Sequence, residues 1–182
     1  MSDLYSVILA DPPWKYQYWS PAAEGTRRAE NHYPVMELED ICALPIEKTT
    51  NENCALFIWA TWPLLYESHE VIKAWGFKYK TLAWVWLKSN KTGFGFFTGM
   101  GFYTRANTEP CLLATKGSMP VAVHNIQALI YSPVREHSRK PDDQYRKIES
   151  LYPGRKCLEL FARREREGWD VWGNEVDGIE LT

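Results

Sequence analysis

Asp11, Pro12, Pro13 and Trp14 directly follow an apolar run at residues 7–10 that is predicted to be a buried strand. Two consecutive prolines have no backbone N–H, so the strand must end there. Their rings stiffen the turn and leave its carbonyl oxygens free to accept hydrogen bonds. A carboxylate, carbonyl acceptors and a large flat ring therefore occur together. This set suits a planar amine on a heteroaromatic ring, because the acceptors take its two N–H protons while the indole stacks on the ring.

The sequence Asp-Pro-Pro-Trp resembles the catalytic signature of N6-adenine methyltransferases, in the family typified by the catalytic subunit of the eukaryotic messenger-RNA adenosine methyltransferase. Alone, the tetrapeptide also fits N4-cytosine enzymes. Three downstream segments resemble further blocks of the family, in the same order: Ser-Arg-Lys-Pro-Asp at 138–142, Leu-Glu-Leu-Phe-Ala-Arg at 158–163 and Gly-Asn-Glu at 173–175. The resemblance thus runs from Asp11 to about Glu175 and favours adenine.

The resemblance implies a role for each matching residue. Asp11, Pro12, Pro13 and Trp14 would be catalytic: the Asp11 carboxylate and the Pro12 carbonyl would accept hydrogen bonds from the exocyclic amine, and Trp14 would stack on the adenine. The implied cofactor is S-adenosylmethionine. The residues expected to bind it are Asp11, Lys140, Phe161, Arg163, Asn174 and Glu175. Direct transfer from a sulfonium needs mainly proximity and orientation, so no metal is expected.

Structural explanations compete with several of these roles. Asp11 could cap a turn and Trp14 could be a core aromatic residue. Lys140 and Arg163 could be surface cations, and Glu175 a solvated acid.

Composition and charge bound the class of protein. The 182 residues are 45% hydrophobic and 24% charged, which is typical of a globular protein, and we expect a single methyltransferase domain over residues 1–182. No apolar run approaches the length of a membrane span and no signal pattern is visible, so a cytoplasmic location is expected. Four scattered cysteines are expected to be reduced core residues. The net charge of -2 argues mildly against nucleic-acid binding, although residues 135–166 carry 10 basic against 6 acidic side chains.

The elements that would position the site follow from the apolar pattern. Strands are predicted at residues 7–10, 54–60, 81–87, 110–114 and 157–161, and helices at 63–75 and 142–152. This alternation predicts an α/β fold, and the resemblance implies a Rossmann-like class I methyltransferase with a mostly parallel sheet and helices on both faces. It also implies circular permutation, with the catalytic motif before the cofactor motif. Two irregular stretches, 15–33 and 88–108, are predicted to be substrate-gating loops.

The expected substrate is adenine in DNA, because the chain resembles the stand-alone bacterial and phage members, which lack an appended RNA-binding module. RNA adenosine is the first alternative. A catalytically silent scaffold subunit is the second, although such members lose the aspartate or the tryptophan of the signature. A chain of this size leaves target recognition to its loops or to a second subunit, so a homodimer or a partner subunit is expected. No membrane partner is expected.

Overall fold

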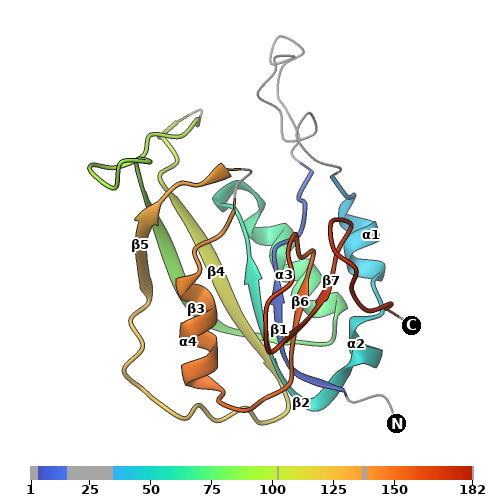
Figure 1. Ribbon diagram of the computed structural model, residues 1–182. Coiled ribbons are helices and arrows are strands. Elements are labelled where there is room, and N and C mark those ends of the chain that lie inside the picture. The colour runs from blue at the N-terminus through green and yellow to red at the C-terminus, as the bar shows by residue number, and fades with distance from the viewer. Residues whose placement is uncertain (1–3, 16–34, 102, 137–138, 182) are drawn as a thin grey trace.

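A seven-stranded sheet forms the centre of the molecule (Figure 1). The computed structural model describes residues 4–15, 35–101, 103–136 and 139–181. The strands are β1 (Tyr5–Ala10), β2 (Thr50–Trp59), β3 (Lys78–Ser89), β4 (Thr108–Lys116), β5 (Leu129–Pro133), β6 (Cys157–Leu160) and β7 (Trp169–Trp172). The helices are α1 (Leu38–Ala43), α2 (Ile46–Thr49), the 3-10 turn η3 (Trp62–Leu64), α3 (Leu65–Ala74) and α4 (Asp143–Leu151).

The sheet is mostly parallel, in the order β5-β3-β4-β2-β1-β6-β7. Strand β4 runs antiparallel to both of its neighbours, β2 and β3. The other pairings, β1 with β2 and β6, β3 with β5 and β6 with β7, are parallel. The carboxyl ends of the parallel strands therefore share one edge of the sheet with the amino end of β4.

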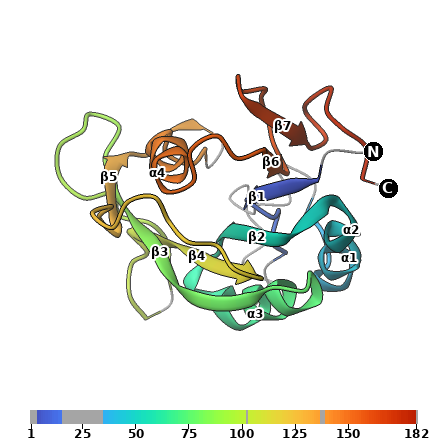
Figure 2. The ribbon, with the colours of Figure 1, turned by 90° about the horizontal axis from the view of Figure 1, so that it is seen from below.

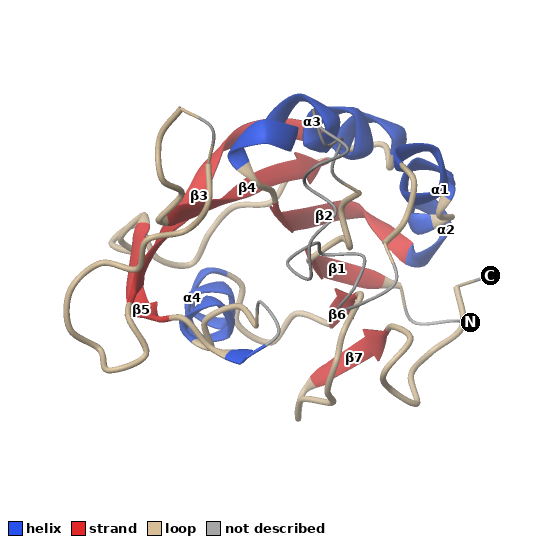
Figure 3. Ribbon diagram, turned by 90° about the horizontal axis from the view of Figure 1, so that it is seen from above, coloured by secondary structure: helices blue, strands red, loops and turns tan. Residues whose placement is uncertain are grey.

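Helices cover both faces of the sheet, as Figures 2 and 3 show: α1, α2 and α3 lie on one face and α4 on the other. Side-chain alternation explains the two layers, because successive residues of a strand point to opposite faces. In β1, Ile8 and Ala10 join the core under α1 and α3, whereas Val7 and Leu9 join the core under α4. A stretch of strand buried on both faces must be apolar throughout, as residues 7–10 of β1 and 54–59 of β2 are.

These observations confirm the predicted α/β fold with a mostly parallel sheet and helices on both faces. All five predicted strands and both predicted helices are present, with the longer helix preceded by a 3-10 turn. Strands β5 and β7 were not predicted, since each is short and supplies few apolar residues. Circular permutation stays a prediction. Within the described residues, no helix is long and apolar enough to cross a membrane.

The core under α4 contains large aromatic side chains, and the expected burial of the cysteines is confirmed for three of the four. Trp59, Trp84 and Trp86 are buried under α4. The indole of Trp59 donates a hydrogen bond to Gln144 of α4, 2.6 Å away, which satisfies its polar atom inside the core. Three of the four cysteines, Cys54, Cys111 and Cys157, are buried as free thiols.

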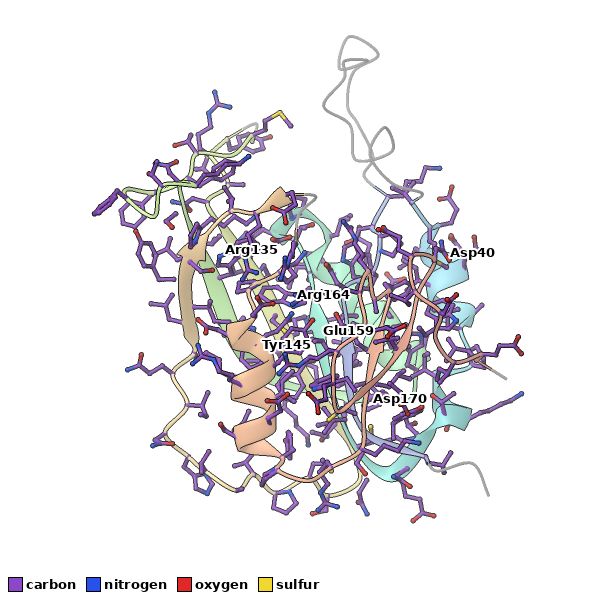
Figure 4. The ribbon with its side chains drawn as sticks, in the orientation of Figure 1. Asp40, Arg135, Tyr145, Glu159, Arg164 and Asp170 are labelled. Atoms are coloured by element: carbon purple, nitrogen blue, oxygen red, sulfur yellow. The ribbon has the colours of Figure 1, made fainter. Side chains whose placement is uncertain are left out.

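Glu159 of β6 and Tyr145 of α4 form a polar contact between the sheet and the helix that covers it (Figure 4). The Tyr145 hydroxyl lies 3.0 Å from both carboxylate oxygens of Glu159 and donates to them. Burial raises the pKa of Glu159 to about 7, although the hydrogen bond from Tyr145 opposes the shift. Because folding favours the protonated carboxyl, Glu159 stabilises the fold only where it keeps its proton.

We expect the variant Glu159→Gln to change the pH dependence of stability. The folded-state pKa of about 7 lies above the ordinary value of 4.5, so the contribution of the wild-type carboxyl is complete below pH 4.5 and is lost by about pH 7. The free energy of unfolding of the wild type, measured relative to Glu159→Gln by urea denaturation, should fall across this window by about 3 kcal/mol at most. Glu52→Gln, at an exposed position, is the control for loss of one carboxylate. A constant difference from pH 4 to pH 8 would contradict this assignment.

Candidate active site

The site residues that the sequence predicts lie at the edge of the sheet where parallel strands end. Asp11 follows β1, Phe161 follows β6, and Asn174 follows β7 closely. Because β1, β6 and β7 are neighbouring parallel strands, the segments after them meet at that edge. Open α/β sheets bind their ligands in this place.

An alternating row of charges is the main feature of the site. Lys140 Nζ lies 2.9 Å from Oδ1 and 3.0 Å from Oδ2 of Asp11, so the pair is bidentate. The same ammonium lies 3.5 Å from Oε1 of Glu109, whose Oε2 is 3.0 Å from Nζ of Lys88. Lys140 is only 8% exposed and sits 5.5 Å from the centroid of the Trp59 ring. The ammonium is therefore held by two carboxylates and an aromatic face.

Burial and the lysines set the ionisation of both carboxylates. Burial raises the pKa of Asp11, and Lys140 opposes the shift only in part, while Glu109 adds to it. Burial would also raise the pKa of Glu109, but Lys140 and Lys88 outweigh it and hold that pKa below its ordinary value. Glu109 therefore carries a firm negative charge that neutralises the lysines and disfavours the ionised form of Asp11.

The turn after β1 is held by backbone hydrogen bonds. The N–H of Trp14 donates to the Pro12 carbonyl at 2.8 Å, and the N–H of Met36 donates to the Pro13 carbonyl at 3.0 Å. Both proline carbonyls therefore accept a backbone hydrogen bond, as acceptors left free by the turn can. Each oxygen retains a second lone pair, so each carbonyl can still accept from a ligand.

Trp14 is part of the hydrophobic core. Its side chain is 7% exposed, and its indole N–H donates to the carbonyl of Trp59 at 3.1 Å. The burial fits the structural explanation for this residue, that of a core aromatic that fixes the turn. The predicted stacking of Trp14 on a base stays a prediction, and in this conformation little of the ring is open to a ligand.

The expected cofactor residues Arg163 and Glu175 face one another across the ends of β6 and β7. Their charged groups are 3.8 Å apart, and the Arg163 charge also lowers the pKa of Asp11. Asn174 and Glu175 are exposed. Phe161, between them and Asp11 along the sheet edge, adopts a left-handed backbone with a φ of 62°. Such a conformation is strained for a bulky residue and is often found at functional sites.

Close backbone packing fixes the chain beside Phe161. The N–H of Ala162 donates to the Trp172 carbonyl at 2.9 Å, and the rings of Phe161 and Trp172 meet edge to face with centroids 5.3 Å apart. A Cβ on Gly173 would lie 2.2 Å from the Ala162 carbonyl oxygen, so only glycine fits there. The turns after β6 and β7 therefore support each other.

These groups fit the recognition of S-adenosylmethionine. Lys140 and Arg163 supply cations for an amino-acid carboxylate, and Glu175 and Asn174 supply acceptors and donors for ribose hydroxyls. Phe161 adds an aromatic side chain at the same edge. When bound, this cofactor supplies a methyl group activated by a positive sulfonium. The individual assignments stay predictions.

Three arginines gather on one carboxylate beside this site. Asp142, which precedes α4, pairs with Arg135 at 2.7 Å, with Arg139 at 3.3 Å and also with Arg164. Figure 4 shows Arg135 and Arg164 above the start of α4, near Tyr145. The arginines outweigh the effect of burial and lower the pKa of Asp142. Part of the basic segment predicted from the sequence is therefore concentrated at the edge that carries Asp11.

Glu109 and Lys88 are site residues to which sequence analysis assigned no role. Glu109 lies in β4 and Lys88 in β3, far along the chain from Asp11. The antiparallel direction of β4 brings Glu109 next to Lys88 and to the edge that carries Asp11. Within the described residues, positions 90–107 of the predicted gating loop at 88–108 belong to no helix or strand, whereas Lys88 and Ser89 end β3 and Thr108 begins β4. The gating role stays a prediction. The other predicted gating loop, at 15–33, lies outside the described residues except for Lys15, which pairs with Glu37.

One surface depression of the described residues is separate from the site. A shallow depression of about 540 Å³ runs along β7 near Trp169, and none of Asp11, Lys140 and Arg163 lines it. Among the residues that the structure describes, no group of three or more His, Cys, Asp or Glu side chains is arranged to hold a metal ion.

Comparison with known proteins agrees with this geometry. The MT-A70 family model matches residues 5–175. The chain is 33% identical to the type II methyltransferase M.MunI of Mycoplasma sp, over 94% of this chain and 78% of that protein. It is 32% identical to a putative MT-A70-like N(6)-adenosine-methyltransferase of Medicago truncatula, and 29% identical to the human N(6)-adenosine-methyltransferase catalytic subunit METTL3.

The alignments with the Medicago and human proteins differ in extent from the alignment with M.MunI. The alignments cover 97% of this chain but only 27% of the Medicago protein and 29% of the human one, so this chain spans less than a third of either. The family match covers all seven strands of the sheet and every residue assigned to the site. The chain therefore belongs to the MT-A70 family of S-adenosylmethionine-dependent methyltransferases.

Proposed function

We propose that this protein transfers a methyl group to the N6 amine of adenine in DNA. The observation that carries the proposal is the Asp11 carboxylate, which lies at the carboxyl end of β1 and is held there by Lys140. A carboxylate beside a proline turn matches an exocyclic amine, whose N–H groups need acceptors. The rest of the edge supplies the groups that suit the cofactor.

The role of Asp11 follows from its charge and its partners. The amine of adenine is a weak nucleophile, because its lone pair is delocalised into the ring. An ionised carboxylate that accepts a hydrogen bond from one N–H of the amine favours a tetrahedral nitrogen and localises the lone pair. Lys140 orients the carboxylate and supports its ionised form against burial. Each carboxylate oxygen keeps a further lone pair for the substrate.

The similarity to a type II methyltransferase over 78% of its length supports DNA as the substrate. The relatives named N(6)-adenosine-methyltransferases instead favour RNA, and they cover this chain as completely. RNA adenosine is therefore the second candidate. A cytoplasmic location and a homodimer or partner subunit remain predictions from the sequence.

Methylation assays on matched DNA and RNA oligonucleotides test the proposal directly. With S-adenosylmethionine, the wild type should form N6-methyladenine in DNA, detected by mass spectrometry of the nucleosides. Asp11→Asn should lower kcat by at least about 100-fold, because the amide cannot offer a charged acceptor. The variant keeps the shape of the side chain, so thermal denaturation should show a folded protein.

Other outcomes of this assay would change the assignment. Methylation of RNA alone would replace DNA by the second candidate. A wild type that binds no S-adenosylmethionine in calorimetry would instead indicate a scaffold subunit.

Glu109→Gln tests how charge at the site sets the pH dependence. The negative charge of Glu109 raises the pKa of Asp11, so its removal should lower that pKa. Asp11 must be ionised to accept the hydrogen bond from the amine, so kcat/KM of the wild type should fall as the pH drops below the pKa of Asp11. In Glu109→Gln this fall should occur at lower pH. Rates measured from pH 4.5 to pH 8 would show the shift. An unchanged acidic limb, as expected for the control Glu52→Gln, would argue against Asp11 as the titrating group.

Lys140→Met tests the cofactor site. The substitution removes the cation that would pair with the amino-acid carboxylate of S-adenosylmethionine. It should therefore weaken binding of this cofactor, measured by calorimetry, by at least about tenfold. It should also destabilise the fold by about 3 kcal/mol, because it leaves Asp11 without its ammonium partner and Glu109 with Lys88 alone. Lys156→Met removes an ammonium from the Asp170 pair at the opposite end of the strands and is the matched control. Equal affinity in all three proteins would rule out Lys140 as a cofactor ligand.

A further inference from the structure

The loop between β3 and β4 exposes a group of aromatic side chains. Phe94 is 82% exposed, Phe96 is 62% exposed and Tyr103 is fully exposed. Tyr131, on the neighbouring edge strand β5, is half exposed and meets Phe96 edge to face, with ring centroids 6.3 Å apart. We call Phe94, Phe96, Tyr103 and Tyr131 the aromatic surface. Several large, solvent-exposed aromatic side chains on one loop and its neighbouring strand indicate an interaction site.

The loop that carries this surface is ordered by its own hydrogen bonds. Asn90 is central to its first turn: its N–H donates to the Gly95 carbonyl at 3.2 Å, and its side-chain amide donates to the Phe94 carbonyl at 3.0 Å. Further along, the N–H of Gly99 donates to the Ala106 carbonyl at 2.9 Å, where a Cβ would come within 2.2 Å of that oxygen. The rings are thus presented by a built turn, which reduces the entropy lost when a ligand stacks on them.

The loop is attached to the candidate active site at both ends. Lys88, at the end of β3, pairs with Glu109, at the start of β4, and Glu109 in turn contacts the Lys140 that holds Asp11. Figure 1 shows the loop projecting from the edge of the sheet where β1 ends. A polymer whose base reaches Asp11 would therefore continue past the base of this loop.

Charge favours a nucleic acid as the occupant. Residues 88–108 contain no Asp or Glu, and Lys91 and Arg105 form no ion pair with any described residue. The cores of protein interfaces are depleted in charged residues, whereas unpaired cations beside exposed rings are typical of surfaces that bind single strands. The rings stack on bases, and the cations meet phosphates.

We propose that the aromatic surface, with Lys91 and Arg105, holds the nucleic-acid strand that flanks the target adenine. Phe94 and Phe96 stack on unpaired bases, and the two cations contact the backbone. The inference rests on the proposed function, because it takes the polymer at Asp11 to be a nucleic acid. It assigns to this loop the binding of the nucleic-acid strand, a role separate from the methyl transfer proposed at Asp11.

The double variant Phe94→Ala/Phe96→Ala tests the inference. Its affinity for a fluorescent single-stranded DNA oligonucleotide, measured by anisotropy, should fall at least about tenfold, and KM for the same strand should rise in parallel. The value of kcat and the affinity for S-adenosylmethionine should stay within about twofold, since neither ring belongs to the site. Lys91→Gln/Arg105→Gln should reduce the salt dependence of oligonucleotide binding by about two charges.

Tyr79→Ala is the matched control, because it removes an exposed ring from the opposite end of β3 and should leave oligonucleotide binding unchanged. Unchanged oligonucleotide affinity in the double variant would overturn the inference, even if the wild type methylates DNA. Loss of a dimer in light scattering with unchanged oligonucleotide affinity would assign the aromatic surface to a second copy of this chain and also overturn it. Anisotropy needs no turnover, so a wild type that binds DNA through the aromatic surface but does not methylate it would disprove the proposed function alone.

Discussion

The ion pair between Asp11 and Lys140 joins parts of the chain that are far apart in sequence, and the candidate site is arranged around it. Asp11 directly follows β1, and Lys140 precedes α4, the helix that covers one face of the sheet. A buried ammonium is costly unless it is paired, so Lys140 requires both Asp11 and Glu109. Glu109 in turn brings Lys88 to the site. One desolvated cation thus fixes the relative positions of β1, the base of the β3–β4 hairpin and the start of α4.

The direction of β4 makes this arrangement possible. In a fully parallel sheet, the amino end of a strand lies at the edge opposite its neighbours' carboxyl ends. Because β4 runs antiparallel to β2 and β3, its first residues lie where β1 and β3 finish. Glu109 can therefore reach Lys140, and the loop before it rises beside Asp11. The reversed strand therefore places both an acidic residue and the β3–β4 loop at the edge that carries Asp11.

The sequence was sufficient for what depends on local pattern. Apolar runs located β1, β2, β3, β4 and β6, and helical spacing located α3 and α4. The motif resemblance located Asp11, Lys140, Phe161, Arg163, Asn174 and Glu175, and the sheet brings the segments that carry them to one edge. Glu109 and Lys88 were missed as site residues because their role depends on strand direction, which no local pattern records. The choice between a core role and a stacking role for Trp14 stayed open for a similar reason, since its burial depends on packing against Trp59 of another strand.

The position of Trp14 bears on how a base is held. An aromatic ring that packs in the core and donates its N–H to Trp59 stiffens the proline turn, and a stiff turn keeps the Asp11 carboxylate and the proline carbonyls in place. The same burial leaves little of the ring open for stacking. For the proposed nucleic-acid substrate, aromatic contacts would then come largely from other residues. Among the described residues near this edge, those of the β3–β4 loop expose the most ring surface. In the proposed function, orientation of the reacting amine and retention of the strand therefore fall to different segments, which are coupled through Glu109.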